Sequence, residues 1–157
     1  MASGRSTQIT KQIGENLAVA ELGRRGYIAT SFSGNVPEID ILAFSPSGKA
    51  FPVQVKAIQG ESWQFDIRTY LDVELQDDTQ IIQGKVTSAD RKLICIFIRV
   101  GRQNEDQFYL FRWSVLQDYF FATYKGGKRP KNPKSFHCAI WPKSLETYRD
   151  NWKILPK

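Results

Sequence analysis

The chain of 157 residues has a net charge of +6 and 41% hydrophobic residues, which indicates a globular chain with a core of its own rather than a disordered one. No apolar run approaches the roughly 18 residues of a membrane span, and no signal-peptide pattern opens the sequence, so we expect a soluble, cytoplasmic protein. Cys95 and Cys138 lie far apart in apolar runs, which favours reduced core cysteines. With His137 as the single histidine, a zinc site is excluded.

The positive charge is concentrated towards the C-terminus. Residues 1–120 hold 13 Lys and Arg against 14 Asp and Glu, a balance of −1, whereas residues 121–157 hold 9 against 2, a balance of +7. Segregated positive charge indicates a polyanionic partner, with nucleic acid first and an acidic membrane surface second. A surface that only keeps the protein in solution would have the same charge, so composition alone leaves both readings open.

We expect residues 1–6 to be a disordered leader and residues 7–157 to form a single domain. From Thr7 to Arg25 the pattern is helical, with an apolar stripe at spacings of four, four and three formed by Ile9, Ile13, Leu17 and Ala20. Gly26 follows two arginines and stands where such a helix is expected to end.

Glu15 lies on a second face of this helix, one turn ahead of small and apolar residues. From that position its carboxylate can reach a site at the edge of the core. The alternative is an ordinary exposed glutamate on a helix surface, and spacing alone does not separate the two.

Two apolar segments, residues 39–44 and 51–56, flank the turn-forming segment 45–48 and predict a β-hairpin. These strands carry polar side chains at Asp40, Gln54 and Lys56. Because strand side chains alternate between faces, one carboxylate, one amide and one ammonium group can meet on one side of the hairpin. A charge on an apolar strand is costly unless it is paired or bound to a metal, so this cluster is the candidate site.

Further strands are expected around the hairpin. Residues 93–100 are apolar almost throughout and predict a central strand covered on both faces. Residues 63–75 alternate between apolar and polar, which predicts a long strand or a bent hairpin, and the polar residues 76–90 are interpreted as a loop. Shorter strands are expected at residues 27–32, 107–111 and 135–141.

Two helices are expected in the second half of the chain. Trp113 to Tyr124 has helical spacing of its apolar residues, and Ser144 is a plausible N-cap for a terminal helix through Trp152. His137, which alternates with apolar residues and has no acidic or cysteine neighbour at ligand spacing, is interpreted as structural.

The segment 125–134 combines two glycines and two prolines with five basic residues, namely Lys125, Lys128, Arg129, Lys131 and Lys134. Its composition predicts an irregular loop. Such a loop can wrap nucleic-acid phosphates with a salt-dependent affinity and little sequence preference. A solvated charged loop without a ligand is the alternative.

The residue types of the candidate site suit phosphodiester hydrolysis. Carboxylate and amide oxygens are hard ligands of the kind that Mg²⁺ prefers. A metal ion held there could polarise a phosphoryl oxygen and lower the pKa of a bound water. Lys56 could orient that water or stabilise the negative charge that grows on phosphorus.

The order and spacing of these residues resemble the PD-(D/E)xK nuclease superfamily. The matching residues are Glu15 on a helix, Asp40 on a strand and Gln54-Val55-Lys56 on the next strand. Within the superfamily, residues 10–57 are most similar to archaeal Holliday-junction resolvases and to small endonuclease-like proteins. The resemblance implies a restriction-endonuclease-like α/β fold, in which an N-terminal helix and C-terminal helices flank a mixed central sheet.

The same resemblance implies a role for each matching residue. Asp40 would be the main ligand of Mg²⁺ or Mn²⁺, Gln54 would take the place of the second acidic ligand, and the Val55 carbonyl would complete that edge of the site. Lys56 would be the catalytic lysine, and Glu15 would act on the metal or its water. DNA is the implied substrate, and a homodimer is implied because relatives of this fold often dimerise to cut both strands.

Two features depart from the family pattern. Gln54 stands where glutamate is commoner, which removes one negative charge from the site, although several branches have glutamine there. The strand-like residues 63–75 lie where the minimal pattern has a helix.

The sequence therefore supports three hypotheses. The first is a metal-dependent DNA endonuclease. The second is a catalytically inert nucleic-acid-binding or interaction module on the same fold, which the neutral Gln54 favours. The third is an unrelated α/β domain in which Asp40 and Lys56 form a buried ion pair.

Overall fold

The computed structural model describes residues 4–34, 36–124, 128–129 and 132–157. We expected one domain over residues 7–157. Within the chain, two compact units are distinguished. Unit 1 and unit 2 alternate along the chain, so no linker in the sequence marks the division between them. Unit 1 comprises Met1–Trp63, Leu93–Phe111 and Trp141–Lys157, and unit 2 comprises Gln64–Lys92 and Arg112–Ile140.

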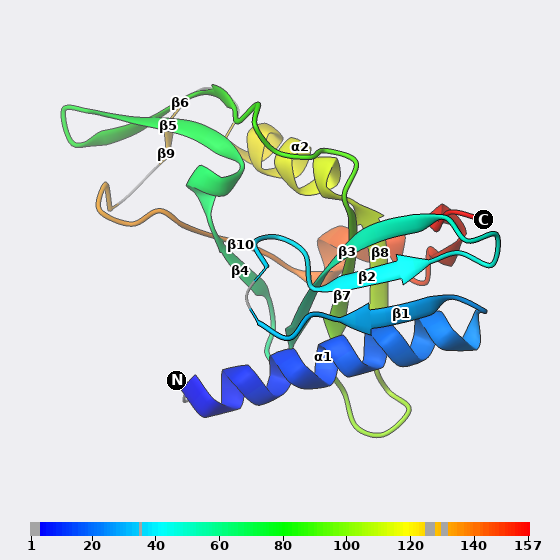
Figure 1. Ribbon diagram of the computed structural model, residues 1–157. Coiled ribbons are helices and arrows are strands. Elements are labelled where there is room, and N and C mark those ends of the chain that lie inside the picture. Colours follow the sequence, from blue (N-terminus) through cyan, green and yellow to red (C-terminus); the bar gives the residue numbers. More distant parts are fainter. Residues whose placement is uncertain (1–3, 35, 125–127, 130–131) are drawn as a thin grey trace. The chain divides into compact units, whose positions relative to one another are not determined.

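Unit 1 is built on a five-stranded sheet in the order β1-β2-β3-β7-β8 (Figure 1). Its strands β1, β2 and β3 are antiparallel neighbours, whereas β3 and β7 run parallel, so the sheet is mixed. Every residue of β7 from Ile94 to Ile98 is buried, as its apolar sequence predicts. The predicted α/β fold with a mixed central sheet is confirmed. The bounds are β1 Ile28–Ser31, β2 Ile41–Phe44, β3 Ala50–Ile58, β7 Ile94–Arg99 and β8 Gln107–Arg112.

The helix α1 (Gly4–Arg24) packs on β1 and β3. It begins at Gly4, so residues 4–6 of the expected leader are helical, and it stops before Gly26, whose φ of 87° suits a glycine. The predicted apolar stripe is wrong, because Ile9 is 45% exposed. The helix instead buries a line of mostly small residues at a spacing of four, namely Thr10, Gly14, Ala18 and Leu22.

The second face of the sheet carries aromatic side chains. Trp63 packs on Phe97 and Tyr109 with ring centroids 5.2 and 5.6 Å apart, and Phe97 packs on Phe111 at 4.8 Å. The C-terminal α-helix that we predicted from Ser144 is wrong. The chain forms two 3₁₀ segments, Pro142–Tyr148 and Trp152–Ile154, separated by Asp150 at a φ of 50°, a value that no continuous helix allows.

Unit 2 has its own aromatic core around Tyr70, whose ring lies 5.0 Å from those of both Trp113 and Phe120. The helix α2 (Trp113–Thr123) confirms the helical pattern there. Its Gln117 is fully buried, and its amide donates to the carbonyls of Tyr70 and Val86, both at 2.8 Å. The strands are β4 Trp63–Asp66, β5 Leu71–Gln76, β6 Thr79–Lys85, β9 Lys128–Arg129 and β10 His137–Ile140, with a 3₁₀ turn at Ile67–Thr69.

Two expectations for unit 2 are corrected. The strand expected over residues 63–75 is broken by the 3₁₀ turn, so β4 pairs with β10 and β5 pairs with β6. The loop expected over residues 76–90 contains β6, and the turn between β5 and β6 holds Asp77 and Asp78 at φ values of 46° and 58°. Among the described residues, no helix is long and apolar enough to cross a membrane.

Gly14 is where α1 comes closest to the sheet. A Cβ atom built there would lie 2.4 Å from the Ala57 Cβ, which is far inside van der Waals contact. We therefore expect Gly14→Ala to lower the free energy of unfolding by about 1–3 kcal/mol, as overpacking does. The measurement is urea unfolding followed by circular dichroism.

Gly23→Ala is the matched control on the same helix. A Cβ atom built at Gly23 has no atom within 4 Å other than those of its chain neighbours and of the helix backbone. Alanine is the better helix former by up to roughly 1 kcal/mol, so this variant should be neutral or more stable. Equal effects of the two substitutions would contradict the packing described here.

Candidate active site

Asp40 lies where β2 separates from β3. The β2–β3 pairing runs from Phe44↔Ala50 to Ile41↔Val53, and the Asp40 amide still donates to the Val53 carbonyl at 3.0 Å. Two residues further along β3, the Val55 N–H donates to Asp40 Oδ2 at 2.8 Å. The Asp40 carboxylate thus accepts from the Val55 N–H, which would have bonded to a β2 backbone carbonyl if β2 had continued alongside β3. This contact fixes the carboxylate at the edge of the sheet.

The Val55 carbonyl shares this edge. The N–H and C=O groups of one strand residue point to the same neighbouring strand, and successive residues alternate. Ile58 accepts from Val100, on the continuation of β7, so the even-numbered residues of β3 face β7 and Val55 faces the β2 side. Its carbonyl oxygen therefore points to the same edge as the Asp40 carboxylate.

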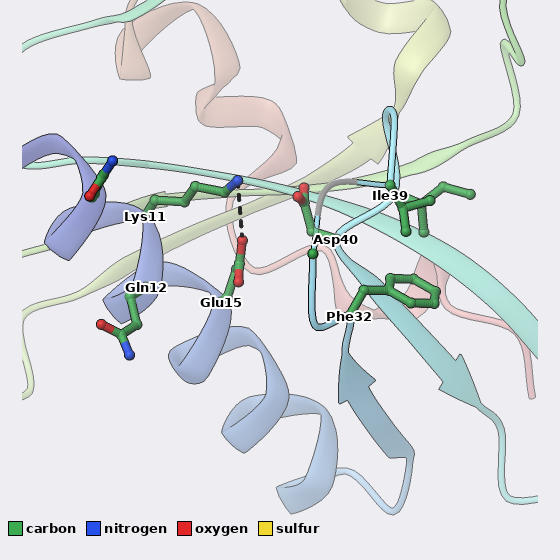
Figure 2. A pocket seen from close by; sticks show the side chains of 9 residues that line it. Lys11, Gln12, Glu15, Phe32, Ile39 and Asp40 are labelled. Carbon is green, nitrogen blue, oxygen red and sulfur yellow. Dashed lines mark ion pairs between the residues drawn. The ribbon is translucent and has the colours of Figure 1, made fainter. Parts of the chain in front are cut away.

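Glu15 reaches this region from α1. Glu15 and Asp40 both line an open pocket of ≈ 170 Å³ between the first half of α1 and the segment ahead of β2. Figure 2 shows Lys11 and Glu15 on α1 and Asp40 on the facing segment, with a dashed line from the Lys11 ammonium group to the Glu15 carboxylate. The Lys11 Nζ lies 3.8 Å from Glu15 Oε1. The two carboxylates that the sequence assigned to one site thus come together.

The electrostatics of Glu15 reflect this crowding. Burial raises the pKa of its carboxyl above 4.5, and the negative charge of Asp40 raises it further, while Lys11 acts in the opposite direction. Two carboxylates that repel one another across a pocket form a site that favours a cation. An exposed helical glutamate, the alternative reading of Glu15, would lack both effects.

Gln54 and Lys56 occupy the neighbouring positions of β3 but do not line this pocket. Gln54 is 8% exposed, and its Oε1 accepts a long hydrogen bond from the Cys95 thiol at 3.7 Å. Lys56 is exposed, and its backbone carbonyl accepts from Trp63 Nε1 at 3.2 Å. Among the described residues, no ion pair joins Lys56 to Asp40, so a buried ion pair between them does not explain the pattern.

The oxygen atoms near Asp40 suit a hard divalent cation. Two carboxylates and one backbone carbonyl supply three oxygen donors, and Mg²⁺ commonly keeps several waters as its remaining ligands. Among the described residues, no group of three or more His, Cys, Asp and Glu is placed to hold a metal ion. A metal here would therefore depend on amide, carbonyl or water oxygens beyond Glu15 and Asp40.

Lys11 also lines the pocket, although it was not predicted as a site residue from the sequence. Its position four residues before Glu15 was the available signal, because residues at i and i+4 are neighbours on one helix face. Lys11 stands on the helix face that lines the pocket, together with Gln8 and Gln12.

The basic segment of unit 2 is described in part. Lys125 and Lys131 lie outside the described residues, as does the side chain of Lys128. Arg129 is held within unit 2, because its guanidinium donates to Gln80 Oε1 and to the His137 carbonyl. Lys134 is exposed. The backbone of residues 128–129 pairs with β6 as β9, so part of the expected irregular loop is a strand.

Comparison with known proteins places the fold. No protein-family model matches the sequence, and no curated protein matches it. The structure is similar to that of a bacterial homing endonuclease, I-Ssp6803I, with 18% sequence identity and a TM-score of 0.55, over 95% of this chain and 92% of that chain. The chain therefore has an endonuclease-like α/β fold.

The raised pKa of Glu15 has a consequence for stability. Between pH 4.5 and the raised value, the folded protein binds more protons at Glu15 than the unfolded chain does, so this group destabilises the fold as pH rises through that window. We expect Glu15→Gln to raise the thermal midpoint at pH 7, and the gain to disappear below pH 4.5.

Glu21→Gln is the control for this measurement. Glu21 lies on the same helix and pairs with Arg24 and Arg25 at 2.7 and 2.6 Å. Its loss should leave the thermal midpoint at pH 7 unchanged or lower. A Glu15→Gln midpoint that does not rise at pH 7 would be inconsistent with a destabilised carboxylate pair.

Proposed function

We propose that this protein is a metal-dependent DNA endonuclease of the PD-(D/E)xK type. The observation that carries the proposal is the Asp40 carboxylate bound to the Val55 N–H at 2.8 Å, across a pocket from Glu15, on the edge of a mixed sheet. The endonuclease-like fold supports it, because the similar structure is that of a homing endonuclease.

In this proposal Asp40 is the main ligand of Mg²⁺ or Mn²⁺, with the Val55 carbonyl and Glu15 beside it. When bound, the metal would polarise a phosphoryl oxygen and lower the pKa of the attacking water. Lys56 supplies an exposed ammonium group on the same strand, which stabilises the negative charge that develops on phosphorus.

Gln54 would contribute a neutral amide oxygen in place of a carboxylate. Its Oε1 accepts a hydrogen bond from the Cys95 thiol. A thiol is a weak donor, so Oε1 would lose only a weak hydrogen bond if it turned to bind the metal. A metal site with one charge fewer binds its cation less tightly. This leaves Asp40 and Glu15 as the charged ligands.

DNA would be bound through phosphate contacts that carry little sequence information. Lys134, Lys125, Lys128 and Lys131 of unit 2 are proposed to contribute these contacts. Arg129 belongs to the same basic segment but already donates to protein carbonyls, so it is expected to contribute less. A homodimer would provide one such site for each strand of a duplex.

The second candidate function is a catalytically inert nucleic-acid-binding module. The observation in its favour is the buried, neutral Gln54 in the place of a second acidic ligand. Such a module would bind DNA with a strong salt dependence and without any metal requirement.

A cleavage assay separates the two functions. The substrates are labelled duplex, nicked, flap and four-way-junction DNA, each with Mg²⁺, Mn²⁺ or EDTA. We expect metal-dependent cutting that Asp40→Asn and Lys56→Met each reduce on the order of 10²-fold or more, because the first removes a charge that holds the metal and the second removes the ammonium group beside the reacting phosphate.

Lys49→Met is the charge-matched control, since Lys49 is an exposed residue of the turn between β2 and β3. It should cut at the rate of the parent protein. Cutting by Lys56→Met or Asp40→Asn at the parent rate would overturn the assignment. DNA binding without any cutting would establish the inert module.

Gln54→Glu tests the role of the amide by a second route. A carboxylate at this buried position, beside the Cys95 thiol, should lower the thermal midpoint in EDTA, because a buried charge without a partner is costly. Saturating Mn²⁺ should restore much of that loss and raise the midpoint of the variant more than that of the parent. An equal response of both proteins to Mn²⁺ would remove Gln54 from the metal site.

A further inference from the structure

Lys11 is the cation of the pocket that holds Glu15 and Asp40. It lies one turn ahead of Glu15 on α1, and its side chain is 59% exposed. Figure 2 shows the Lys11 side chain on the side of α1 that faces Asp40, with the ion pair to Glu15 drawn as a dashed line. The ammonium group is thus paired with Glu15 in a pocket that Asp40 also lines, and the proposed function assigns both carboxylates to a metal.

Helix stability does not account for this ion pair. A pair at 3.8 Å whose lysine side chain is 59% exposed contributes little. Moreover, Lys11 precedes Glu15, and at i,i+4 spacing the better order has the glutamate first. The pair is therefore weak and readily exchanged.

The charges of the pocket-lining residues that the structure describes sum to −1, from Glu15, Asp40 and Lys11. A divalent cation that enters brings the total to +1 and repels the ammonium group from the carboxylates. Lys11, on its flexible four-carbon stem, then has no anionic partner in the pocket. A DNA phosphate that approaches the pocket supplies one.

We propose that Lys11 is an exchangeable counter-ion, which offsets part of the negative charge of the carboxylate pair in the metal-free protein and pairs with a DNA phosphate once the divalent cation is bound. This inference rests on the proposed function and adds a coupling to it: metal binding prepares the pocket for the phosphate backbone. Lys11 is thus a positioning residue, separate from the proposed catalytic Lys56.

The test measures binding, with Ca²⁺ as a cation that allows DNA to bind without being cut. Calorimetric titration without DNA gives the affinity for Ca²⁺. Fluorescence anisotropy of a labelled duplex over a series of salt concentrations gives DNA affinity and its salt slope, in Ca²⁺ and in EDTA. Parent, Lys11→Met and Lys11→Arg are compared.

For Lys11→Met we expect Ca²⁺ to bind about fivefold tighter or more, the effect of removing one competing charge at about 4 Å. The slope of log K against log salt should fall by about 0.9 in Ca²⁺, the value of one phosphate contact, and stay unchanged in EDTA. Lys11→Arg should keep the slope of the parent in both conditions.

Arg24→Met is the matched control. Arg24 forms an ion pair with Glu21 on the same helix but does not line this pocket, so its loss should change neither Ca²⁺ affinity nor the difference between the two slopes. A Lys11→Met slope that falls equally with and without Ca²⁺, or in neither, overturns the coupling while leaving the nuclease in place. Failure of the parent to bind Ca²⁺ or DNA at all overturns the proposed function as well.

Discussion

The hydrogen bond from the Val55 N–H to the Asp40 carboxylate is the contact on which the candidate site depends. Where β2 leaves β3, a backbone donor on the sheet edge needs an acceptor, and an unpaired buried donor would be costly. Asp40 meets that need with one carboxylate oxygen, Oδ2. The Val55 carbonyl points to the same edge, so a break in strand pairing creates the polar end of an otherwise apolar sheet.

The close packing of α1 on this sheet brings in the second carboxylate. Small residues at Gly14 and Ala18 let the helix backbone approach β3, and Glu15 follows directly after the closest contact. The cost is a carboxyl group held near Asp40 with a raised pKa. A pocket that destabilises the metal-free fold in this way is better suited to binding a cation than to holding the fold together.

The sequence predicted the parts of the fold that local chemistry determines. The hairpin of β2 and β3, the apolar β7 and α2 follow from alternation and helical spacing, and Asp40 and Glu15 do share a pocket. Packing decided the rest: α1 buries Gly14 rather than Ile9, and Gln54 is buried beside Cys95, a contact made only when β7 pairs with β3. The β6 strand was missed because its Asp77-Asp78 turn lacks glycine, although aspartate tolerates positive φ.

The measurement that tests the site most directly is anomalous diffraction from crystals of the protein soaked in Mn²⁺. We predict one manganese peak within coordination distance of the Asp40 carboxylate and the Val55 carbonyl, with Glu15 directed towards it, and loss of that peak in Asp40→Asn. Manganese bound elsewhere, or no bound manganese in a protein that cuts DNA, would contradict this assignment of the metal site.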